Sequence, residues 1–124
     1  MDDEAAIRTL IEAWASAVRD KDMDRILAHH GDDMLMFDVP EPLLSRGMAE
    51  YRATWDLFFQ YSTGGPRSFN VHDIEVTAGD RVAFATAIID IFDSSLRLTV
   101  GLRKDGDQWL IVHEHHSYPV KVGE

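Results

Sequence analysis

Residues 69–117 decide the fold; their sequence is FNVHDIEVTAGDRVAFATAIIDIFDSSLRLTVGLRKDGDQWLIVHEHHS. Apolar and polar residues alternate through much of this stretch, which predicts four β-strands, at residues 69–77, 81–92, 96–104 and 108–117. Short turn sequences separate the strands, namely AGD, DSS and DGD. Consecutive strands joined by such short connections predict an antiparallel meander.

The half of the chain before these strands is mainly helical. Apolar residues recur at helical spacing between positions 7 and 18, and the acidic residues in front of them can cap the helix. A short second helix is predicted after Asp22, ending at Gly31, with His29 and His30 interacting favourably with its dipole. A third helix is predicted at residues 48–61.

One strand is predicted between the helices, over residues 34–39. It stops at Pro40, because proline cannot donate to a sheet ladder, and residues 43–46 form a brief second extended piece. Helices kept apart from an antiparallel sheet define the α+β class, and a long sheet must twist and curl. We therefore expect one domain over residues 1–124: a cone-shaped, strongly curved antiparallel sheet with three helices packed on its concave face, enclosing a pocket.

Composition excludes several classes of function. The chain has 124 residues and a formal net charge of −10, which argues against a nucleic-acid-binding surface. It contains no cysteine, so disulfides, thiolate nucleophiles and cysteine zinc sites are excluded. No apolar stretch is long enough to span a bilayer, and the first residues do not form a secretory signal, so we expect a cytoplasmic protein without membrane contacts.

Asp38 lies at the end of an apolar run, in the sequence MLMFDVP at residues 34–40. A carboxylate among such neighbours is costly to ionise unless another group pairs with it. Two interpretations remain open. Asp38 either accepts hydrogen bonds at the strand end, as aspartate often does in turns, or is a carboxylate that serves chemistry.

The last predicted strand is unusually polar for a buried element. Strict alternation places Glu114 and His116 on one face together with Val112. A carboxylate and an imidazole two residues apart on one face can share a proton and tune each other's pKa, so they form a candidate acid–base pair. The alternative is a solvated or partner-facing part of the sheet.

Histidines also raise the question of a metal site. His113 and His115 share the other face of the last strand, and His72 would have to be the third ligand. A zinc site needs at least three protein ligands and a second shell, and no spacing supports that set. We therefore expect neither a metal site nor a cofactor.

Three stretches together resemble a known family. They are AWA to DMD to HGDD at residues 13–33, FDVPEP at 37–42 followed by an Arg-Gly pair and a helix, and WLIVHEHHS at 109–117. In this order and spacing, nearly the whole chain resembles the nuclear-transport-factor-2-like superfamily, in its SnoaL-like and ketosteroid-isomerase-like branch. The resemblance implies a cystatin-like roll and a homodimer formed through the open face of the sheet.

The resemblance also implies roles for single residues. Asp38 aligns with the general-base aspartate of ketosteroid isomerase. Trp14 stands where that enzyme has its tyrosine donor, and Thr99 or Val100 stands near its aspartic acid donor, so both groups that stabilise the enolate are changed. The resemblance orients Val112, together with Glu114 and His116, into the cavity.

Further residues are expected to line the pocket, because aromatic residues on the third helix must cover the sheet. If Arg97 faces inward it needs an anionic partner, and if it faces outward it is a solvated surface residue. The predicted ligand-binding set is Trp14, Tyr51, Trp55, Phe58, Arg97, Thr99 and Val112.

Two hypotheses about function follow. The first is a small-molecule-binding domain with acid–base catalysis of isomerase, cyclase or dehydratase type on an apolar carbonyl compound. In it, Asp38 is the base and Glu114 and His116 assist. The second is a non-catalytic ligand-binding or dimerisation module. A homodimer is expected under both.

Overall fold

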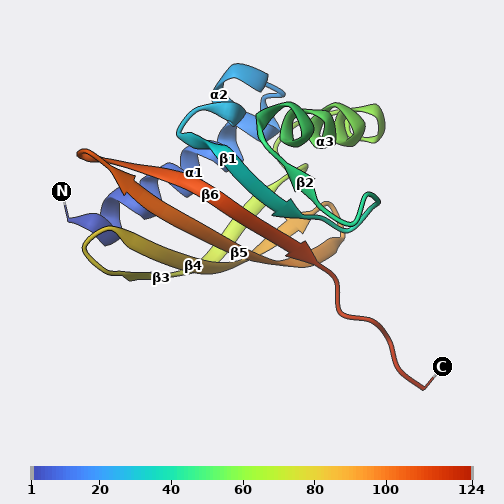
Figure 1. Cartoon of the computed structure of the whole chain (residues 1–124). Helices are drawn as coiled ribbons and strands as arrows, with labels where there is room; N and C mark the ends of the chain where they lie inside the picture. Colours follow the sequence, from blue (N-terminus) through green and yellow to red (C-terminus); the bar gives the residue numbers. More distant parts are fainter. Residues whose placement is uncertain (1, 124) are drawn as a thin grey trace.

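The structure is a computed structural model that describes residues 2–123. Its helices are α1 (Asp3–Arg19), α2 (Met23–Leu27) and α3 (Met48–Tyr61). Its strands are β1 (His30–Phe37), β2 (Ser45–Arg46), β3 (Asn70–Ala78), β4 (Val82–Ile91), β5 (Ser94–Asp105) and β6 (Gln108–Ser117). All three helices lie on one side of a curved six-stranded sheet, which confirms the predicted α+β class (Figure 1).

The strands follow the order β2-β1-β6-β5-β4-β3 across the sheet. Strands β3 to β6 form the expected antiparallel meander. Strand β1, however, pairs in parallel with β6, so the sheet is mixed and not wholly antiparallel. No hairpin joins β1 to β6, because α3 and the meander lie between them in sequence, and short-turn signals therefore do not fix their relative direction.

Strand β1 begins at His30, four residues before its predicted start. The Ile111 N–H donates to the His29 carbonyl oxygen at 2.8 Å, and His30 is opposite Ile111 in the register. The pairing with β6 therefore recruits Gly31 into the strand, so this glycine does not end α2. The chain turns just before the strand, where His29 has a φ of 59°.

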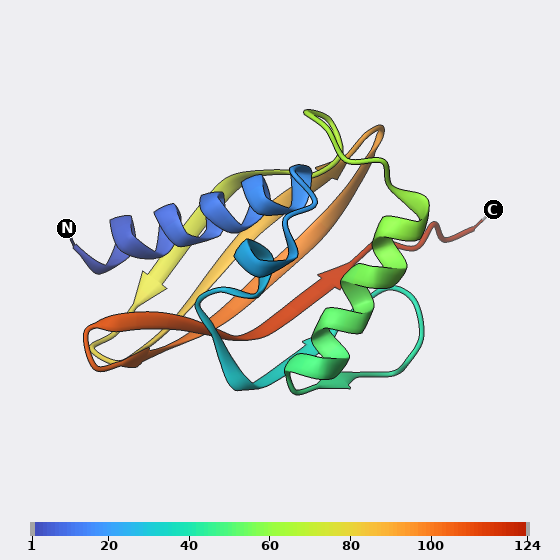
Figure 2. The same cartoon turned by 90° about the horizontal axis from the view of Figure 1, so that it is seen from above.

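The core lies between α1, α3 and the inner face of the meander. Asp2 caps helix α1: its side chain accepts the Ala5 N–H at 2.7 Å, a bond that contributes about 1 kcal/mol. Its apolar face packs on β3, and α3 packs on β1 and β2, as Figure 2 shows from above. Almost fully buried aliphatic residues of β4 and β5 face these helices: Ala85, Ala87, Ile89, Leu96, Leu98, Val100 and Leu102.

Gly47 fixes where α3 begins. Its φ is 85°, in the left-handed region that favours glycine. Its N–H donates to the Met34 carbonyl oxygen at 2.7 Å, and its carbonyl oxygen accepts the Tyr51 N–H at 3.0 Å. These bonds tie the first turn of α3 to β1, so Tyr51 is held against that strand.

A bulge in β6 decides which of its residues face the helices. Gly101 pairs with His113 and Leu102 pairs with Ile111, so Val112 is the extra residue. Such a residue reverses the alternation of a strand. Residues Trp109 and Ile111 before the bulge are buried, and so are Glu114 and His116 after it.

Among residues 2–123, the helices are all too short or too polar to cross a membrane.

Candidate functional site

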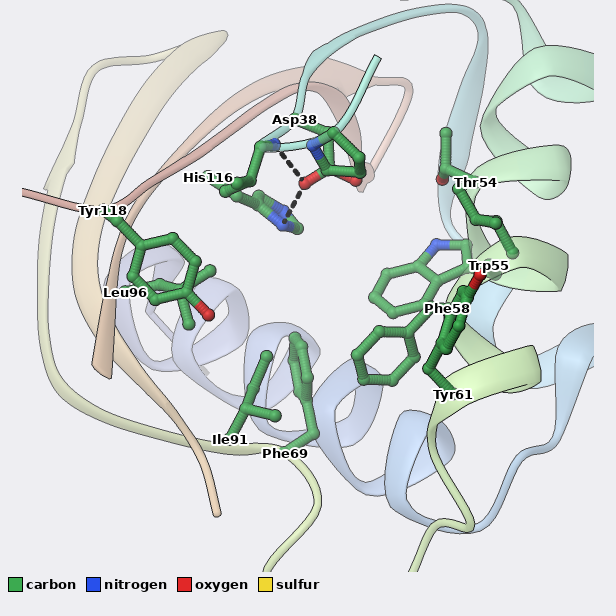
Figure 3. Close-up of a pocket in the computed structure, with 13 residues that line it drawn as sticks. Asp38, Thr54, Trp55, Phe58, Tyr61, Phe69, Ile91, Leu96, His116 and Tyr118 are labelled. Carbon is green, nitrogen blue, oxygen red and sulfur yellow. Dashed lines mark hydrogen bonds and ion pairs between the residues drawn. The ribbon is translucent and has the colours of Figure 1, made fainter. Parts of the chain in front are cut away.

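A cavity of about 300 Å³ opens between α3 and the ends of β4, β5 and β6 (Figure 3). Ligand-binding cavities are typically apolar with a few converging polar groups, and this one fits that description. Its lining residues are Asp38, Val39, Pro40, Thr54, Trp55, Leu57, Phe58, Tyr61, Phe69, Ile91, Leu96, His116 and Tyr118. Asp38 and His116 are the only ionisable side chains among them besides two tyrosines.

Asp38 and His116 meet because of the parallel pairing of β1 with β6. The register places Phe37 opposite His115. The residues that follow them, Asp38 just after β1 and His116 on β6, therefore lie side by side. Asp38 Oδ1 lies 3.7 Å from His116 Nδ1 and accepts the Val39 N–H at 2.8 Å. Figure 3 shows both contacts at one wall of the cavity. The side chain of Asp38 is 24% exposed and that of His116 is 7% exposed, so solvent reaches mainly the carboxylate.

Behind His116 lies Glu114, whose side chain is fully buried. Its Oε1 is 3.0 Å from His116 Nε2, and its Oε2 is 3.0 Å from His30 Nε2. The Tyr51 hydroxyl donates to Oε2 at 2.6 Å, and the Trp14 indole N–H donates to the Tyr51 oxygen at 3.1 Å. Side chains from β1, α3 and β6 thus satisfy one buried carboxylate, as burial of such a group requires, and Trp14 of α1 supports the network through Tyr51.

These contacts set the charges in the network. Burial raises the pKa of Glu114, but hydrogen bonds and positive charge from His116 and His30 outweigh it and lower that pKa to about 2. Burial lowers the pKa of His116, while the hydrogen bond and charge of Glu114 and the charge of Asp38 raise it above its ordinary value overall. Burial and the charge of Glu114 raise the pKa of Tyr51 well above its usual range, so its hydroxyl keeps its proton and donates.

The arrangement resembles the carboxylate–histidine pairs in which one ring nitrogen is fixed and the other is presented to a ligand. Here Nε2 of His116 is bonded to Glu114, and Nδ1 faces Asp38. The 3.7 Å between Nδ1 and Oδ1 exceeds a good hydrogen bond. A protonated Nδ1 can therefore donate to a ligand oxygen beside a carboxylate that accepts a proton.

The predicted site residues are found in two layers. Asp38, His116, Trp55 and Phe58 line the cavity. The expectation that Glu114, Trp14 and Tyr51 face the ligand is wrong, because none of them lines the cavity. Hydrogen bonds link Glu114 to His116, Tyr51 to Glu114 and Trp14 to Tyr51. The predicted pairing of Glu114 with His116 on one inward face is therefore present.

Arg97, Thr99 and Val112 lie outside the cavity, which corrects the expectation that they line it. Arg97 and Thr99 are exposed, and Arg97 donates to Ser117 Oγ and to the Tyr118 carbonyl oxygen. Leucines and valine at the alternate positions of β5 take the inner face, because burying them removes more apolar surface from water. Val112 is displaced from the inner face by the bulge.

His30 lies in a different place from the one predicted for it. We expected it to interact with a helix dipole, but it begins β1, and its side chain is fully buried against Glu114. The register of β1 against β6 shifts between His30 and Leu35, so no regular alternation marks His30 as inward-facing.

Trp55 leaves one polar atom unsatisfied. Its indole N–H is buried and has no hydrogen-bond partner within the described chain. Aromatic neighbours fix its ring, with Phe58 at 5.5 Å and Phe69 at 5.7 Å between centroids, both in edge-to-face geometry. Across residues 2–123, no group of three or more His, Cys, Asp or Glu side chains is placed to hold a metal ion.

Comparisons with solved structures agree with this architecture. An NTF2-like protein of unknown function from Pseudomonas putida is 35% identical, with 98% of this chain and 92% of that chain covered and a TM-score of 0.83. A candidate ketosteroid isomerase from Parabacteroides distasonis is 20% identical, with coverage of 94% and 88% and a TM-score of 0.71. A candidate aromatic ring hydroxylase from Novosphingobium aromaticivorans is 17% identical, with coverage of 96% and 90% and a TM-score of 0.77. The last two likenesses show the fold alone.

A search of curated proteins gave no match. The family model of the SnoaL-like domain matches residues 7–121, which is nearly the whole chain. The sequence resemblance is thereby confirmed: this chain belongs to the SnoaL-like family, with the NTF2-like, cystatin-like fold.

Proposed function

We propose that the cavity binds a small, apolar, carbonyl-bearing compound and that Asp38 removes a proton from the carbon next to the carbonyl. The observation that carries this proposal is that Asp38 and His116 meet on one wall of a mostly apolar cavity. Family membership alone supports no particular reaction, because one fold hosts many functions.

Apolar and aromatic side chains of the cavity walls contact the apolar part of the ligand. Trp55, Phe58 and Phe69 supply faces and edges of rings, and Ile91 and Leu96 close the opposite side. Such walls favour an uncharged ring or chain that leaves water on binding. A carbonyl group is then the part of the ligand that the polar wall can recognise.

The proposed chemistry balances with the groups at hand. The Asp38 carboxylate accepts the α-proton, and the electron pair of the broken C–H bond moves into the carbonyl, which becomes an enolate. The Nδ1–H of His116 donates a hydrogen bond to the enolate oxygen, the task of an oxyanion donor. Return of the proton to another carbon gives an isomer, and loss of a leaving group from the β-carbon gives elimination.

His116 offers a hydrogen-bond donor for the enolate oxygen, which the positions that differ from ketosteroid isomerase do not. Trp14 donates to Tyr51, and Tyr51 donates to Glu114, so neither is free to donate to a ligand. Thr99 is exposed on the outer face. A structural neighbour described as a candidate ketosteroid isomerase is consistent with enolate chemistry on this fold, as an analogy.

A second candidate function is ligand binding without catalysis. The Val39 N–H already donates to Asp38 Oδ1, which is ordinary strand-end chemistry for aspartate. In that case the cavity still binds an apolar compound, but no proton is exchanged.

Exchange of α-protons for deuterium separates the two functions. A panel of apolar ketones is incubated in D₂O with the wild-type protein or with Asp38→Asn, and exchange is followed by proton NMR. General-base catalysis contributes about 10²- to 10⁴-fold, so we expect the variant to lose exchange by about that factor while circular dichroism stays unchanged. Arg97→Gln, outside the cavity, is the matched control. Equal exchange by wild type and Asp38→Asn would contradict the role of Asp38, and binding without exchange would favour the second function.

A further inference from the structure

His30 is buried beside the site but is not used by the proton transfer described above. Its side chain is fully buried and does not line the cavity. Its Nδ1 lies 2.9 Å from the Ala28 carbonyl oxygen, and its Nε2 lies 3.0 Å from Glu114 Oε2. Both neighbours are acceptors, so a ring with protons on both nitrogens satisfies both contacts. The ring also packs against Tyr51, at 4.8 Å between centroids.

Two imidazoles therefore share one carboxylate. His30 approaches Oε2 of Glu114 and His116 approaches Oε1, each at 3.0 Å. The Tyr51 hydroxyl adds an uncharged donor on Oε2. Inside a protein, two positive charges held on opposite oxygens of one carboxylate repel each other, and their titrations become coupled.

Other elements add one more charge next to His116. Asp38 faces its Nδ1 from the end of β1, at 3.7 Å. The rings of Trp14 on α1 and Trp55 on α3 pack against it at 6.2 and 6.5 Å between centroids, and both are uncharged. Among the described residues, Glu114 is thus the one group that both His30 and His116 contact.

We propose that His30 is a positioning residue that competes with His116 for Glu114, so that protonation of either ring opposes protonation of the other. His30 then sets the pH below which His116 carries a proton on Nδ1, the state that donates to a ligand oxygen. An effect of His30 on catalysis rests on the proposed function. The coupling between His30 and His116, however, is a property of the protein without ligand.

The test is the titration of His116, followed by its ring nitrogens in long-range ¹H–¹⁵N NMR spectra of the ligand-free protein. His30→Gln is the informative variant, because its amide can still donate to Glu114 but never carries a charge. We expect the titration midpoint of His116 to rise by roughly one pH unit in this variant, since a competing positive charge is removed.

The direction in which the His116 titration midpoint moves in His30→Gln separates coupling from structural damage. If His30 only filled space, its replacement would loosen the site, and the His116 midpoint would fall towards that of an ordinary histidine or stay unchanged. Either result would overturn the proposal. Glu114→Gln serves as a reference in the opposite direction: it should lower the titration midpoint of His116, because it removes the anion next to that ring. His72→Gln is the matched control, because His72 pairs with Asp90 on β4 and lies outside this network.

The proposal remains testable if His30→Gln does not fold. In the wild-type protein, coupling of this size spreads the titration of the His116 ring signals over two steps. A single step for His116 would contradict the proposal. This measurement needs no substrate, so its failure is distinct from a failure of the α-proton exchange with Asp38→Asn.

Discussion

Replacing Glu114 by glutamine perturbs the centre of the network, and the structure sets the size of the effect. The contacts lower the pKa of Glu114 from 4.5 to about 2, which corresponds to roughly 3 kcal/mol of stability while the carboxylate is ionised. Glutamine keeps one acceptor oxygen, but its amide group faces donors that need an acceptor. An unpaired buried donor costs about 1–3 kcal/mol. We therefore expect Glu114→Gln to lower the free energy of unfolding by about 3 kcal/mol.

The loss of unfolding free energy in Glu114→Gln should depend on pH. The pKa of Glu114 is lowered on folding, so its contribution is present above pH 4.5 and is lost as pH falls towards 2. The pKa of His116 is raised on folding, so its contribution is present below pH 6.5 and is lost as pH rises through the pKa of the folded state. The difference between wild type and variant is therefore largest between about pH 4.5 and 6.5.

Urea unfolding at pH 3, 5.5 and 8 measures this difference. Glu75→Gln is the matched control, because Glu75 is an exposed glutamate on β3, and a change within about 0.5 kcal/mol is expected for it. An equal loss for Glu114→Gln at all three pH values, or a loss no larger than that of the control, would refute the reasoning.

Three further predictions concern separate parts of the molecule. Trp14→Phe removes the donor to the Tyr51 hydroxyl, and urea unfolding should show a loss of about 1–2 kcal/mol. Phe58→Ala removes a wall of the cavity and should weaken binding of apolar ketones about tenfold or more by fluorescence titration, whereas Arg97→Ala should leave the affinity unchanged. We propose a homodimer through the outer face of the sheet, where Phe84 is 50% exposed, so Phe84→Lys should halve the mass measured by light scattering. A wild-type monomer at micromolar concentration would contradict this dimer.

Much of the fold could be predicted from local sequence signals. The bounds of α3 and β6 are as predicted, because glycine and turn residues flank a helical pattern in one case and a strand in the other. The meander likewise follows from its short turns. Pairing of β1 with β6 joins segments distant in sequence, so its parallel direction and the early start of β1 had no local signal.

The candidate site could be predicted only in part, because contacts between segments distant in sequence also form it. Asp38 stood out because its apolar neighbours made a carboxylate there costly, and Glu114 and His116 stood out by their spacing. The bulge that moves Val112 outward depends on the partner strand and not on β6 alone. Contact between His30 and Glu114 joins residues 84 positions apart, so it appears only once the sheet is assembled.

A crystal structure of the protein soaked with apolar ketones tests the central claim most directly. The account predicts the ligand in the cavity between α3 and β6, with its carbonyl oxygen within hydrogen-bonding distance of His116 Nδ1 and its α-carbon beside the Asp38 carboxylate. A ligand bound with its carbonyl away from both groups, or a cavity that stays closed by its own aromatic side chains, would contradict it.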